Sequence, residues 1–408
     1  MTHRLYYDDA YLTQFTATVL DCRPERDGWA ARLNRSAFYP TSGGQPYDTG
    51  VLGGARVLDV WVDQAGEVWH LTDAPLEAGA QVEGRIDWPR RFDHMQQHAG
   101  EHMLAGVIWR RLGGRTIGLH LGDSFSTIDV ELPGGQMRVE PQVLAELEET
   151  VNAQIQADLP IRCYFPTPQQ LAQAPLRKPP TVREHIRLVQ VGDVECVACG
   201  GTHPASSGQI GLVKILDARP SRGKMRVSFV CGMRALRDYQ QKFLSAQAAA
   251  ALLSTGVEEL PKAVEHALER LHQAQRELKR AQLDRALDRA AQLTQEAAAL
   301  PGGGRAVSCV LAGLDRDGLR EVAGYLTGQG VAALLAGEEG PGAPLVFAAP
   351  AQLGLSMGQL LSQVLKPLGG KGGGRPDFAQ GAGPGRAALE AAMARLSGGA
   401  ETAGEVAP

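Results

Sequence analysis

Two histidines four residues apart are the first candidates for metal chemistry. His98 and His102 lie within RRFDHMQQHAGEHMLAGVIWRRL, residues 90–112, a stretch without proline that predicts a helix. Four helical residues turn the chain by about 400°, so both imidazoles share one face and can reach one ion. His94 stands one turn earlier, so the spacing alone leaves open which two of the three histidines bind.

A second pair of metal-binding side chains occurs in CVACGGTH, residues 196–203. Cys199 and His203 bracket two glycines and Thr202, and glycines allow the tight backbone that would turn both side chains toward one ion. Together with two histidines they offer three nitrogens and one sulfur, a set that suits tetrahedral zinc. The alternatives are ordinary surface histidines, and a redox or zinc-knuckle role for the Cys196–Cys199 pair.

The overall composition is that of a soluble globular protein of several domains. The chain has 408 residues, 44% hydrophobic and 21% charged; at roughly 100–200 residues per domain this predicts two to four domains. The net charge of −4 argues mildly against nucleic-acid binding. The six cysteines are mostly isolated, which is not typical of a disulfide framework. The N-terminus lacks an apolar signal segment and no run is long enough to span a bilayer, so we expect a cytoplasmic protein.

The elements that must position these side chains predict an α+β multidomain protein. Residues 1–88 read as short strands, with a hairpin over 55–71 and a glycine-rich turn at 42–45, and predict a small β-barrel. Residues 89–240 mix strands and helices, including an amphipathic helix over 141–160, and form a central α+β domain that carries the zinc candidates.

The C-terminal part of the chain has a different character. Residues 241–300 are helical; the seam of Val264, Leu268, Leu271 and Leu278 indicates either a helical hairpin within the chain or a coiled coil between two chains. After PGGG at 301–304, alternating strands and helices predict a small α/β domain over 301–408 with a glycine-rich loop at 369–383.

Four blocks of sequence resemble the freestanding alanyl-tRNA editing proteins of the AlaX type and the editing and C-terminal parts of alanyl-tRNA synthetase. In family order they are FYPTSGGQPYDTG (38–50), RRFDHMQQHAGEHML (90–104), CGGTH (199–203) and GGKGGGRPDFAQGAG (369–383). The resemblance spans about residues 5–400 but includes no aminoacylation domain, so we expect a protein that does not charge tRNA. Ala99 departs from the family helix, which has a threonine after the first histidine, and this puts a hydroxyl near the site in doubt.

The resemblance implies a trans-editing hydrolase that removes serine, with glycine as a second candidate, from mischarged alanine tRNA at one zinc ion. It assigns the metal to His98, His102, Cys199 and His203, and it leaves out His94 and Cys196. It also implies a C-terminal domain that binds tRNA and carries a homodimer interface. The residues expected to contact the substrate are Gln45, Gly43, Gly44 and Thr202. Those expected to contact tRNA phosphates are Arg90, Arg91, Lys371 and Arg375.

Two other functions remain open from the sequence. Related editing domains share the zinc motifs, so one alternative is the editing of serine from threonine tRNA. The other is a non-catalytic tRNA-binding protein stabilised by zinc, because four protein ligands fill a tetrahedral shell as in structural sites. Catalysis at such a site needs a displaced ligand, a fifth position or one weak ligand.

Overall fold

The computed structural model describes residues 1–398 of the chain, which fall into two compact units. The first unit spans Met1–Ala248 and the second begins at Ala249. The division into four domains made from the sequence stays a prediction, and the end of its last domain, residues 399–408, lies outside the described part. The mixed α and β composition of both units agrees with the predicted class.

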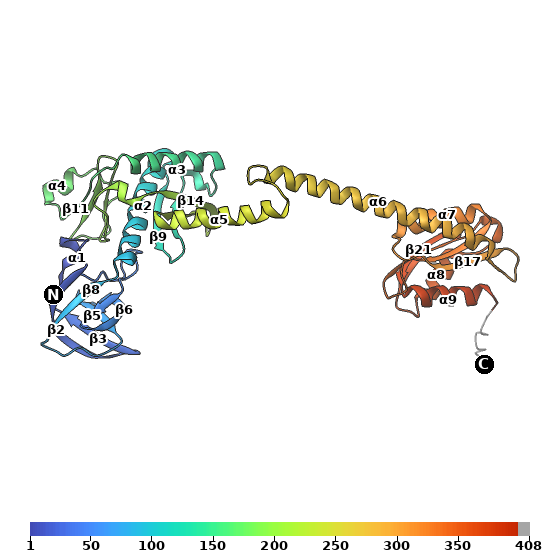
Figure 1. Cartoon of the computed structure of the whole chain (residues 1–408), viewed down its shortest axis with the longest axis horizontal. Helices are drawn as coiled ribbons and strands as arrows, with labels where there is room; N and C mark the ends of the chain where they lie inside the picture. The colour runs from blue at the N-terminus through green and yellow to red at the C-terminus, as the bar shows by residue number, and fades with distance from the viewer. Residues whose placement is uncertain (399–408) are drawn as a thin grey trace. The chain divides into compact units, whose positions relative to one another are not determined.

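The first unit begins with a closed six-stranded barrel, as the sequence predicts (Figure 1). In spatial order its strands are β2 (Gln14–Glu25), β3 (Gly28–Leu33), β7 (Val68–Thr72), β6 (Ala55–Val62), β5 (Gly50–Leu52) and β8 (Gln81–Ile86). The predicted hairpin is the antiparallel pair β6–β7. A parallel pair of two-residue strands, β1 (His3–Arg4) and β4 (Arg35–Ser36), and the short helix α1 (Leu5–Asp8) complete this part.

A neutral histidine lies in the barrel interior. His70 on β7 is fully buried, 2.7 Å from Ser36 Oγ through Nε2 and 3.1 Å from the Ala31 carbonyl oxygen through Nδ1. Burial lowers the pKa of His70 from 6.5 to about 4, and the contact with Ala31 only partly offsets this effect.

The barrel should therefore lose stability in mild acid. The unfolded chain binds a proton at His70 below about pH 6.5 and the folded chain does not until about pH 4, so stability is full above that window and falls within it. From pH 7 to pH 5 we expect His70 to cost on the order of 2 kcal/mol. Urea midpoints followed by tryptophan fluorescence at both pH values measure this loss, and His70→Gln should show a smaller one. An unchanged difference in the variant would contradict the prediction.

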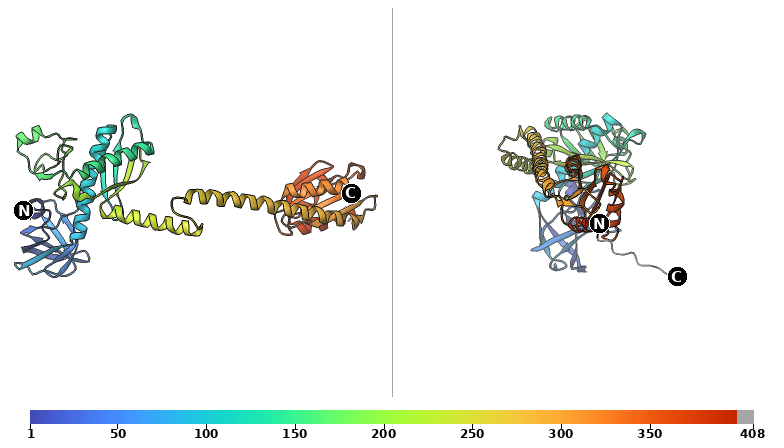
Figure 2. Two further views of the ribbon diagram at one scale, coloured as in Figure 1. Left: turned by 45° about the horizontal axis from the view of Figure 1, so that its top comes forward. Right: turned by 90° about the vertical axis from the view of Figure 1, so that its right-hand side faces the viewer.

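Helix α2 (Trp88–Leu112) joins the barrel to the central part of the unit. The Asp87 side chain caps its start, and Gly113, at φ 64°, ends it in the left-handed conformation. Most of the helix is buried, because it packs on strands β9 (Arg115–Leu121) and β15 (Lys224–Cys231) of a four-stranded sheet and on α3 (Pro141–Gln156) and β13 (Glu195–Ala198). Figure 2 shows the barrel at one end of α2 and the remaining elements of the unit around the rest of the helix.

Two small sheets surround α2. The first has the order β14 (Val213–Ser221), β15 (Lys224–Cys231), β10 (Ser126–Glu131) and β9 (Arg115–Leu121). The second is antiparallel and contains β11 (Ile161–Tyr164), β12 (Leu188–Val191) and β13 (Glu195–Ala198). Helix α3 (Pro141–Gln156) packs against α2 and β14. The short helix α4 (Pro168–Gln173) comes before β12 in the chain, and α5 (Met233–Leu252) follows β15.

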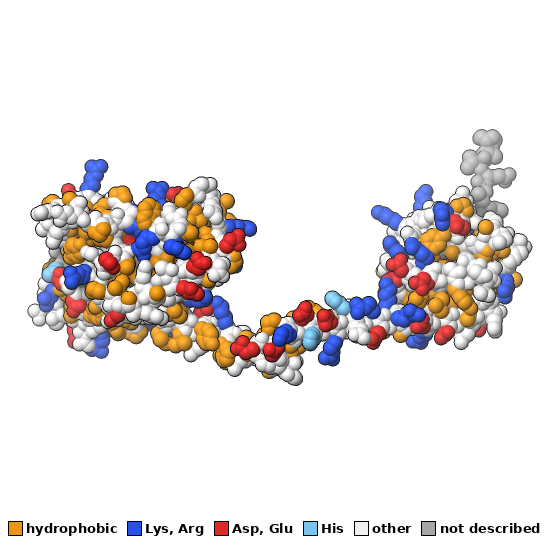
Figure 3. Space-filling model, turned by 90° about the horizontal axis from the view of Figure 1, so that it is seen from above, with side chains coloured by type: hydrophobic (Ala, Val, Ile, Leu, Met, Phe, Trp, Pro, Cys, Tyr) orange, Lys and Arg blue, Asp and Glu red, His pale blue; other side chains and the backbone are white. Residues whose placement is uncertain are grey.

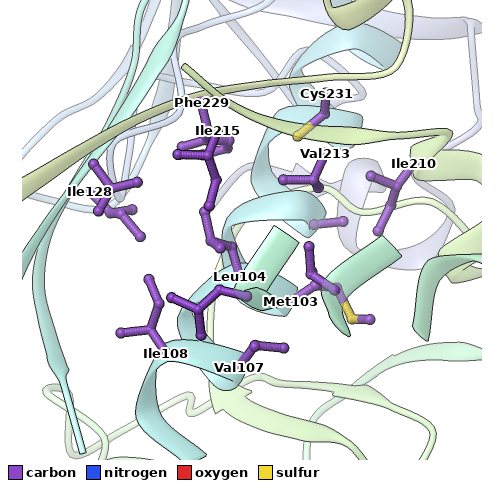
Figure 4. Close-up of a cluster of buried hydrophobic side chains, with 14 of the residues drawn as sticks. Met103, Leu104, Val107, Ile108, Ile128, Ile210, Val213, Ile215, Phe229 and Cys231 are labelled. Carbon is purple, nitrogen blue, oxygen red and sulfur yellow. The ribbon is translucent and has the colours of Figure 1, made fainter. Parts of the chain in front are cut away.

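The core between these elements holds α2 rigidly. Met103, Leu104, Val107 and Ile108 of the helix meet apolar side chains of the four-stranded sheet, such as Phe229 (Figure 4). All five are at most 1% exposed. Dense packing of this kind leaves the helix one orientation, so the residues on its remaining face have fixed positions.

The second unit is a sheet with helices on both faces. Its strand order is β16 (Ala298–Ala299), β17 (Arg305–Val310), β18 (Val331–Ala336), β19 (Ala343–Ala348), β21 (Phe378–Gly383) and β20 (Lys371–Gly374). Helix α7 (Arg316–Gly328) and the end of α6 (Leu260–Gln295) pack on one face, and α8 (Met357–Leu365) and α9 (Gly385–Leu396) pack on the other. The predicted α/β alternation is thus present.

The glycine-rich stretch 369–383 differs from its prediction as a loop. It forms the antiparallel hairpin β20–β21 at the edge of the sheet, with Lys371 opposite Ala382 and Gly374 opposite Ala379. The prediction failed because a run of glycines has no alternation of apolar and polar side chains. Backbone hydrogen bonds to a neighbouring strand, which leave no trace in the sequence pattern, stabilise this segment instead.

The predicted seam of α6 and the apolar residues that follow it on the same helix differ in burial. Leu283, Leu287 and Ala290 pack on the second unit, whereas Val264, Leu268, Leu271 and Leu278 are 43–60% exposed. Figure 3 shows charged side chains of both signs along this helix. The hairpin and the coiled coil both stay predictions for the exposed part. Within residues 1–398, the helices are too short or too polar to cross a membrane.

Candidate metal centre

The structure brings His98, His102, Cys199 and His203 together in the first unit. The two histidines are buried residues of α2, and the other two residues lie on the loop that follows β13. The candidate ligand atoms all lie within 4.8 Å of one another. Cys199 Sγ is 3.3 Å from His98 Nε2 and 3.9 Å from His203 Nε2. The three histidines are buried and Cys199 is half-buried.

The donor set fits a zinc ion. Zinc bonds of about 2.0–2.3 Å in a tetrahedron separate the ligand atoms by roughly 3.5 Å, close to the spacing found here. Nε2 of His102 is buried without a hydrogen-bond partner among residues 1–398, which is costly unless a metal binds there. Burial raises the pKa of the Cys199 thiol, but His98, His102 and His203 lower it further, to well below its ordinary value. The thiolate, which this shift favours, is the form that binds zinc.

His94 and Cys196, which the spacing alone left as alternative ligands, lie outside this group. His94 is buried one turn earlier on α2, and burial lowers its pKa to about 4. Cys196 is buried on β13, where it pairs in register with Gln190 of β12. Neither belongs to the group of side chains that can share one ion.

The loop that carries Cys199 and His203 is held by contacts that the sequence did not reveal. Arg187 is 5% exposed and donates through Nη1 to the carbonyl oxygens of Gly201, at 2.8 Å, and Cys199, at 3.2 Å. Its guanidinium lies 5.1 Å from the ring of Tyr7. An arginine at the start of a strand has no distinctive spacing to the motif, so nothing in the sequence identifies this role.

A carboxylate also adjoins the metal group. Glu101 is 5% exposed, and its Oε2 lies 2.9 Å from His102 Nδ1, outside hydrogen-bond geometry. Metal-bound histidines commonly have a carboxylate at the nitrogen that does not bind the metal. The sequence contained a signal for it, because Glu101 immediately precedes His102. Ala99, by contrast, lies in the hydrophobic core, so a threonine there would not place its hydroxyl at the metal group.

An open cavity of about 460 Å³ adjoins the metal group. Three of the four candidate ligands border it: His98, His102 and Cys199. Its other walls come from the Ser42–Gly43 turn of the barrel, from β9 and from the segment 177–187. Glu101, Thr116, Arg177, Lys178, His185 and Arg187 supply polar or charged groups. A volume of this size is typical of a small-molecule site.

The residues predicted to contact a substrate fall into two groups. Gly43, at φ +58°, is exposed and borders the cavity. Gly44 packs against β9, where its carbonyl oxygen accepts from Leu121 N at 3.1 Å. Gln45 and Thr202 are fully buried and hydrogen-bonded to each other, and their contact with the substrate stays a prediction. Their hydrogen-bonding atoms are used within the protein and face no solvent.

Of the predicted phosphate contacts near α2, Arg91 has a partner inside the protein, and its contact with phosphate stays a prediction. It is fully buried and pairs with the equally buried Asp48, with Nε 2.9 Å from Oδ2. Its remaining donors contact the carbonyl oxygens of Ala10 and Ala37. In this structure the Arg91 guanidinium has no accessible surface with which to contact a phosphate. Arg90 is half-buried and donates to the Tyr47 carbonyl oxygen at 3.1 Å.

Two segments of the chain match known protein families. Residues 186–227 match the family described as the threonyl and alanyl tRNA synthetase second additional domain, and residues 302–399 match the DHHA1 domain. The first of these segments contains Cys199 and His203. The second contains most of the sheet of the second unit, including β20 and β21.

Three relatives show how far the similarity extends. Alanyl-tRNA editing protein AlaX-L of Pyrococcus horikoshii is 35% identical over 256 residues, which are 59% of this chain and 62% of the relative. The alanine–tRNA ligase of Halorubrum lacusprofundi is 32% identical over 96% of this chain and 43% of its own length. Alanyl-tRNA editing protein Aarsd1 of Mus musculus is 28% identical over 91% and 92% of the two chains.

The chain thus spans less than two thirds of the AlaX-L and ligase sequences that it matches, and nearly the whole of Aarsd1. These relatives and the two matched domains make the chain similar to the alanyl-tRNA editing proteins AlaX-L and Aarsd1 and to part of alanine–tRNA ligase.

Proposed function

We propose that this protein hydrolyses the ester that links a wrong amino acid, serine above all, to the terminal adenosine of alanine tRNA. The observation that carries the proposal is that three of the four metal-binding side chains border an open cavity. A purely structural zinc site has no need of such a cavity. The names of the relatives supply the substrate class, since AlaX-L and Aarsd1 are both called alanyl-tRNA editing proteins.

The residues around the cavity have separable tasks. His98, His102, Cys199 and His203 would hold zinc, which when bound supplies Lewis-acid chemistry for ester hydrolysis or anchors the substrate. Lys178 and His185 line the cavity on the segment before β12, where cationic groups suit the phosphate next to the terminal adenosine. The exposed backbone of Gly43 forms the opposite wall, open to the ribose or base.

Selectivity for serine over alanine follows from the polar lining. An alanine pocket in a synthetase cannot strongly reject a residue that only adds a hydroxyl, so a second site must recognise that hydroxyl. Glu101 and Thr116 border the cavity, and both are at most 5% exposed. Alanine would leave buried groups of this kind without a partner, at a cost of about 1–3 kcal/mol each.

A deacylation assay tests the proposal. The full chain is mixed with alanine tRNA carrying serine, glycine or alanine, and with threonine tRNA carrying serine, and loss of the ester is followed with and without a zinc chelator. We expect chelator-sensitive loss of serine from alanine tRNA and little loss of alanine. Faster hydrolysis of Ser-charged threonine tRNA would favour the threonine alternative. Absence of hydrolysis in a zinc-loaded protein would favour the non-catalytic alternative.

We propose that the second unit binds the body of the tRNA. Lys371 begins edge strand β20 and Arg375 follows its end; both are exposed. Arg375, Arg320 and Phe378 border a cavity of about 790 Å³ on this unit. Cations beside an aromatic ring suit phosphate and base contacts of RNA. A homodimer formed through the C-terminal half, and action in the cytoplasm, belong to the same proposal; sedimentation of the full chain tests the dimer.

Loss of these cations should weaken tRNA binding without harming the site. We expect the double variant Lys371→Ala, Arg375→Ala to bind tRNA more weakly, with a salt dependence reduced by about 1–2 phosphate contacts. Hydrolysis of a seryl ester of adenosine alone, which lacks the tRNA body, should be unchanged. Equal effects on both substrates would place these residues in the wrong role. Binding is measured by filter retention at several salt concentrations.

A further inference from the structure

One side chain from the N-terminal barrel region reaches the metal group without bordering the cavity. Gln45 is fully buried, and its Oε1 lies 2.8 Å from His98 Nδ1. The same oxygen accepts from the backbone N–H of Thr202 at 3.2 Å, and Nε2 donates to Thr202 Oγ1 at 2.8 Å. Gln45 therefore bridges the two halves of the metal group, α2 and the loop with Cys199 and His203.

These contacts determine which nitrogen of His98 carries a proton. The Thr202 backbone N–H can only donate, so the Gln45 atom facing it must be the carbonyl oxygen and not the amide nitrogen. The same oxygen faces His98 Nδ1, so Nδ1 must be the donor. Nε2 of the neutral ring then keeps its lone pair, and this is the nitrogen that faces Cys199 Sγ.

The turn that delivers Gln45 is built for this position. Residues 42–45 form a tight turn in which Ser42 and Gln45 exchange backbone hydrogen bonds of 2.9 and 3.1 Å. Gly43 and Gly44 both have positive φ, 58° and 85°, as such a turn requires. A Cβ on Gly44 would come within 2.5 Å of the Leu119 carbonyl oxygen, so only glycine lets the turn dock on β9.

The loop that carries Cys199 and His203 also approaches Gln45 and His98 closely. A Cβ on Gly201 would overlap the His98 ring and come within 2.9 Å of Gln45 Oε1. The buried pair of Asp48 and Arg91 then fixes the chain three residues after Gln45 to the first turn of α2. Gly44 and Gly201 thus serve one purpose, which is to let Gln45, His98 and Thr202 meet.

We propose that Gln45 is a metal-positioning residue, which holds His98 in the tautomer and orientation that present Nε2 to the metal. This inference rests on the proposed zinc site but not on the proposed reaction. It makes the Ser42–Gln45 turn a part of the metal centre, and it removes Gln45 from the residues that contact the substrate. Metal affinity then depends on the docking of the barrel region onto the central elements, since Gln45 lies outside them in sequence.

The test measures metal affinity rather than activity. Full-length variants Gln45→Met and Gln45→Glu are compared with the unchanged protein by competition with a chromophoric zinc chelator, and by the absorption spectrum of bound Co²⁺. Methionine keeps the volume but has no oxygen to accept from His98, so we expect affinity to fall about 10–100-fold. Glutamate still accepts from both His98 and Thr202, so its affinity should stay within a few-fold of the unchanged protein.

Gln97→Met is the matched control. Gln97 is also fully buried, and its side chain bonds to the backbone N–H and carbonyl of Cys231 and to Asp93, with no hydrogen bond to a candidate ligand among the described residues. We expect it to lower the melting temperature but to leave metal affinity unchanged. Where Gln45→Met fails to fold, Gln45→Ala takes its place with the same expected loss.

Two results would overturn the inference. One is a Gln45→Met protein that binds zinc as tightly as the Gln97→Met control. The other is a Gln45→Glu protein weakened as much as Gln45→Met, since packing alone would then explain the loss. A protein that binds zinc as expected and yet hydrolyses no aminoacyl-tRNA would defeat the proposed function and leave this inference standing.

Discussion

Replacing His98 or Cys199 by alanine is expected to abolish both zinc binding and deacylation. Each side chain supplies one of four candidate ligand atoms that lie within 4.8 Å of one another, so its loss leaves only three protein ligands. We expect the rate of serine removal to fall by about 1,000-fold or more, which corresponds to at least about 4 kcal/mol of transition-state stabilisation. Zinc content by mass spectrometry and single-turnover deacylation measure the two effects.

His94→Ala provides the comparison for this result. His94 is buried on the same helix, yet it lies outside the metal group. We expect it to keep its zinc and most of its activity, with some loss of stability from the cavity left behind. An inactive, zinc-free His94→Ala beside an active His98→Ala would show that the ligands are assigned to the wrong turn of α2.

Replacing Arg91 by methionine is expected to destabilise the first unit by about 3–5 kcal/mol, because Asp48 is left as a buried charge without a partner. Asp48 also accepts from the backbone N–H of Tyr39, so it cannot turn toward water without breaking the barrel loop. Urea unfolding followed by tryptophan fluorescence measures the loss. The affinity of the folded fraction for tRNA should be unchanged, since Arg91 has no accessible surface.

Two variants make this result specific. Adding Asp48→Asn to Arg91→Met should restore part of the stability, because the unpaired charge is then gone. Arg90→Ala removes a neighbouring arginine that is half-buried and contacts Tyr47, and we expect it to cost about 1 kcal/mol. If Arg91→Met keeps its stability but binds tRNA more weakly, the phosphate role predicted from the sequence is the correct one.

The sequence alone was sufficient for features that depend on near neighbours. Turn residues and alternation predicted the barrel hairpin β6–β7, and the helical period predicted α2 and α3 within a few residues of their ends. The spacing of His98 and His102, and that of Cys199 and His203, are also local, since a helix and a short loop determine the direction of each pair.

The sequence could not reveal partners that lie far away along the chain. Gln45 and Arg91 are polar and adjoin a motif, which from sequence alone indicates contact with a ligand. In the structure Gln45 bonds to Thr202, 157 positions away, and Arg91 pairs with Asp48, 43 positions away. The glycine run at β20 was misjudged for a related reason, because its partner strand is recognised by the backbone alone.

What the sequence determined by itself, therefore, was most of the element types and the kinds of side chain that the candidate metal group contains. Only the tertiary structure decided which polar side chains face the cavity and which are used inside the protein. The physical reason is that burial and hydrogen-bond partners depend on which distant segments pack together, whereas periodicity records only the face a residue occupies on its own helix or strand. Gln45 is the clearest case, since its position beside His98 requires the barrel region, α2 and the Cys199 loop together.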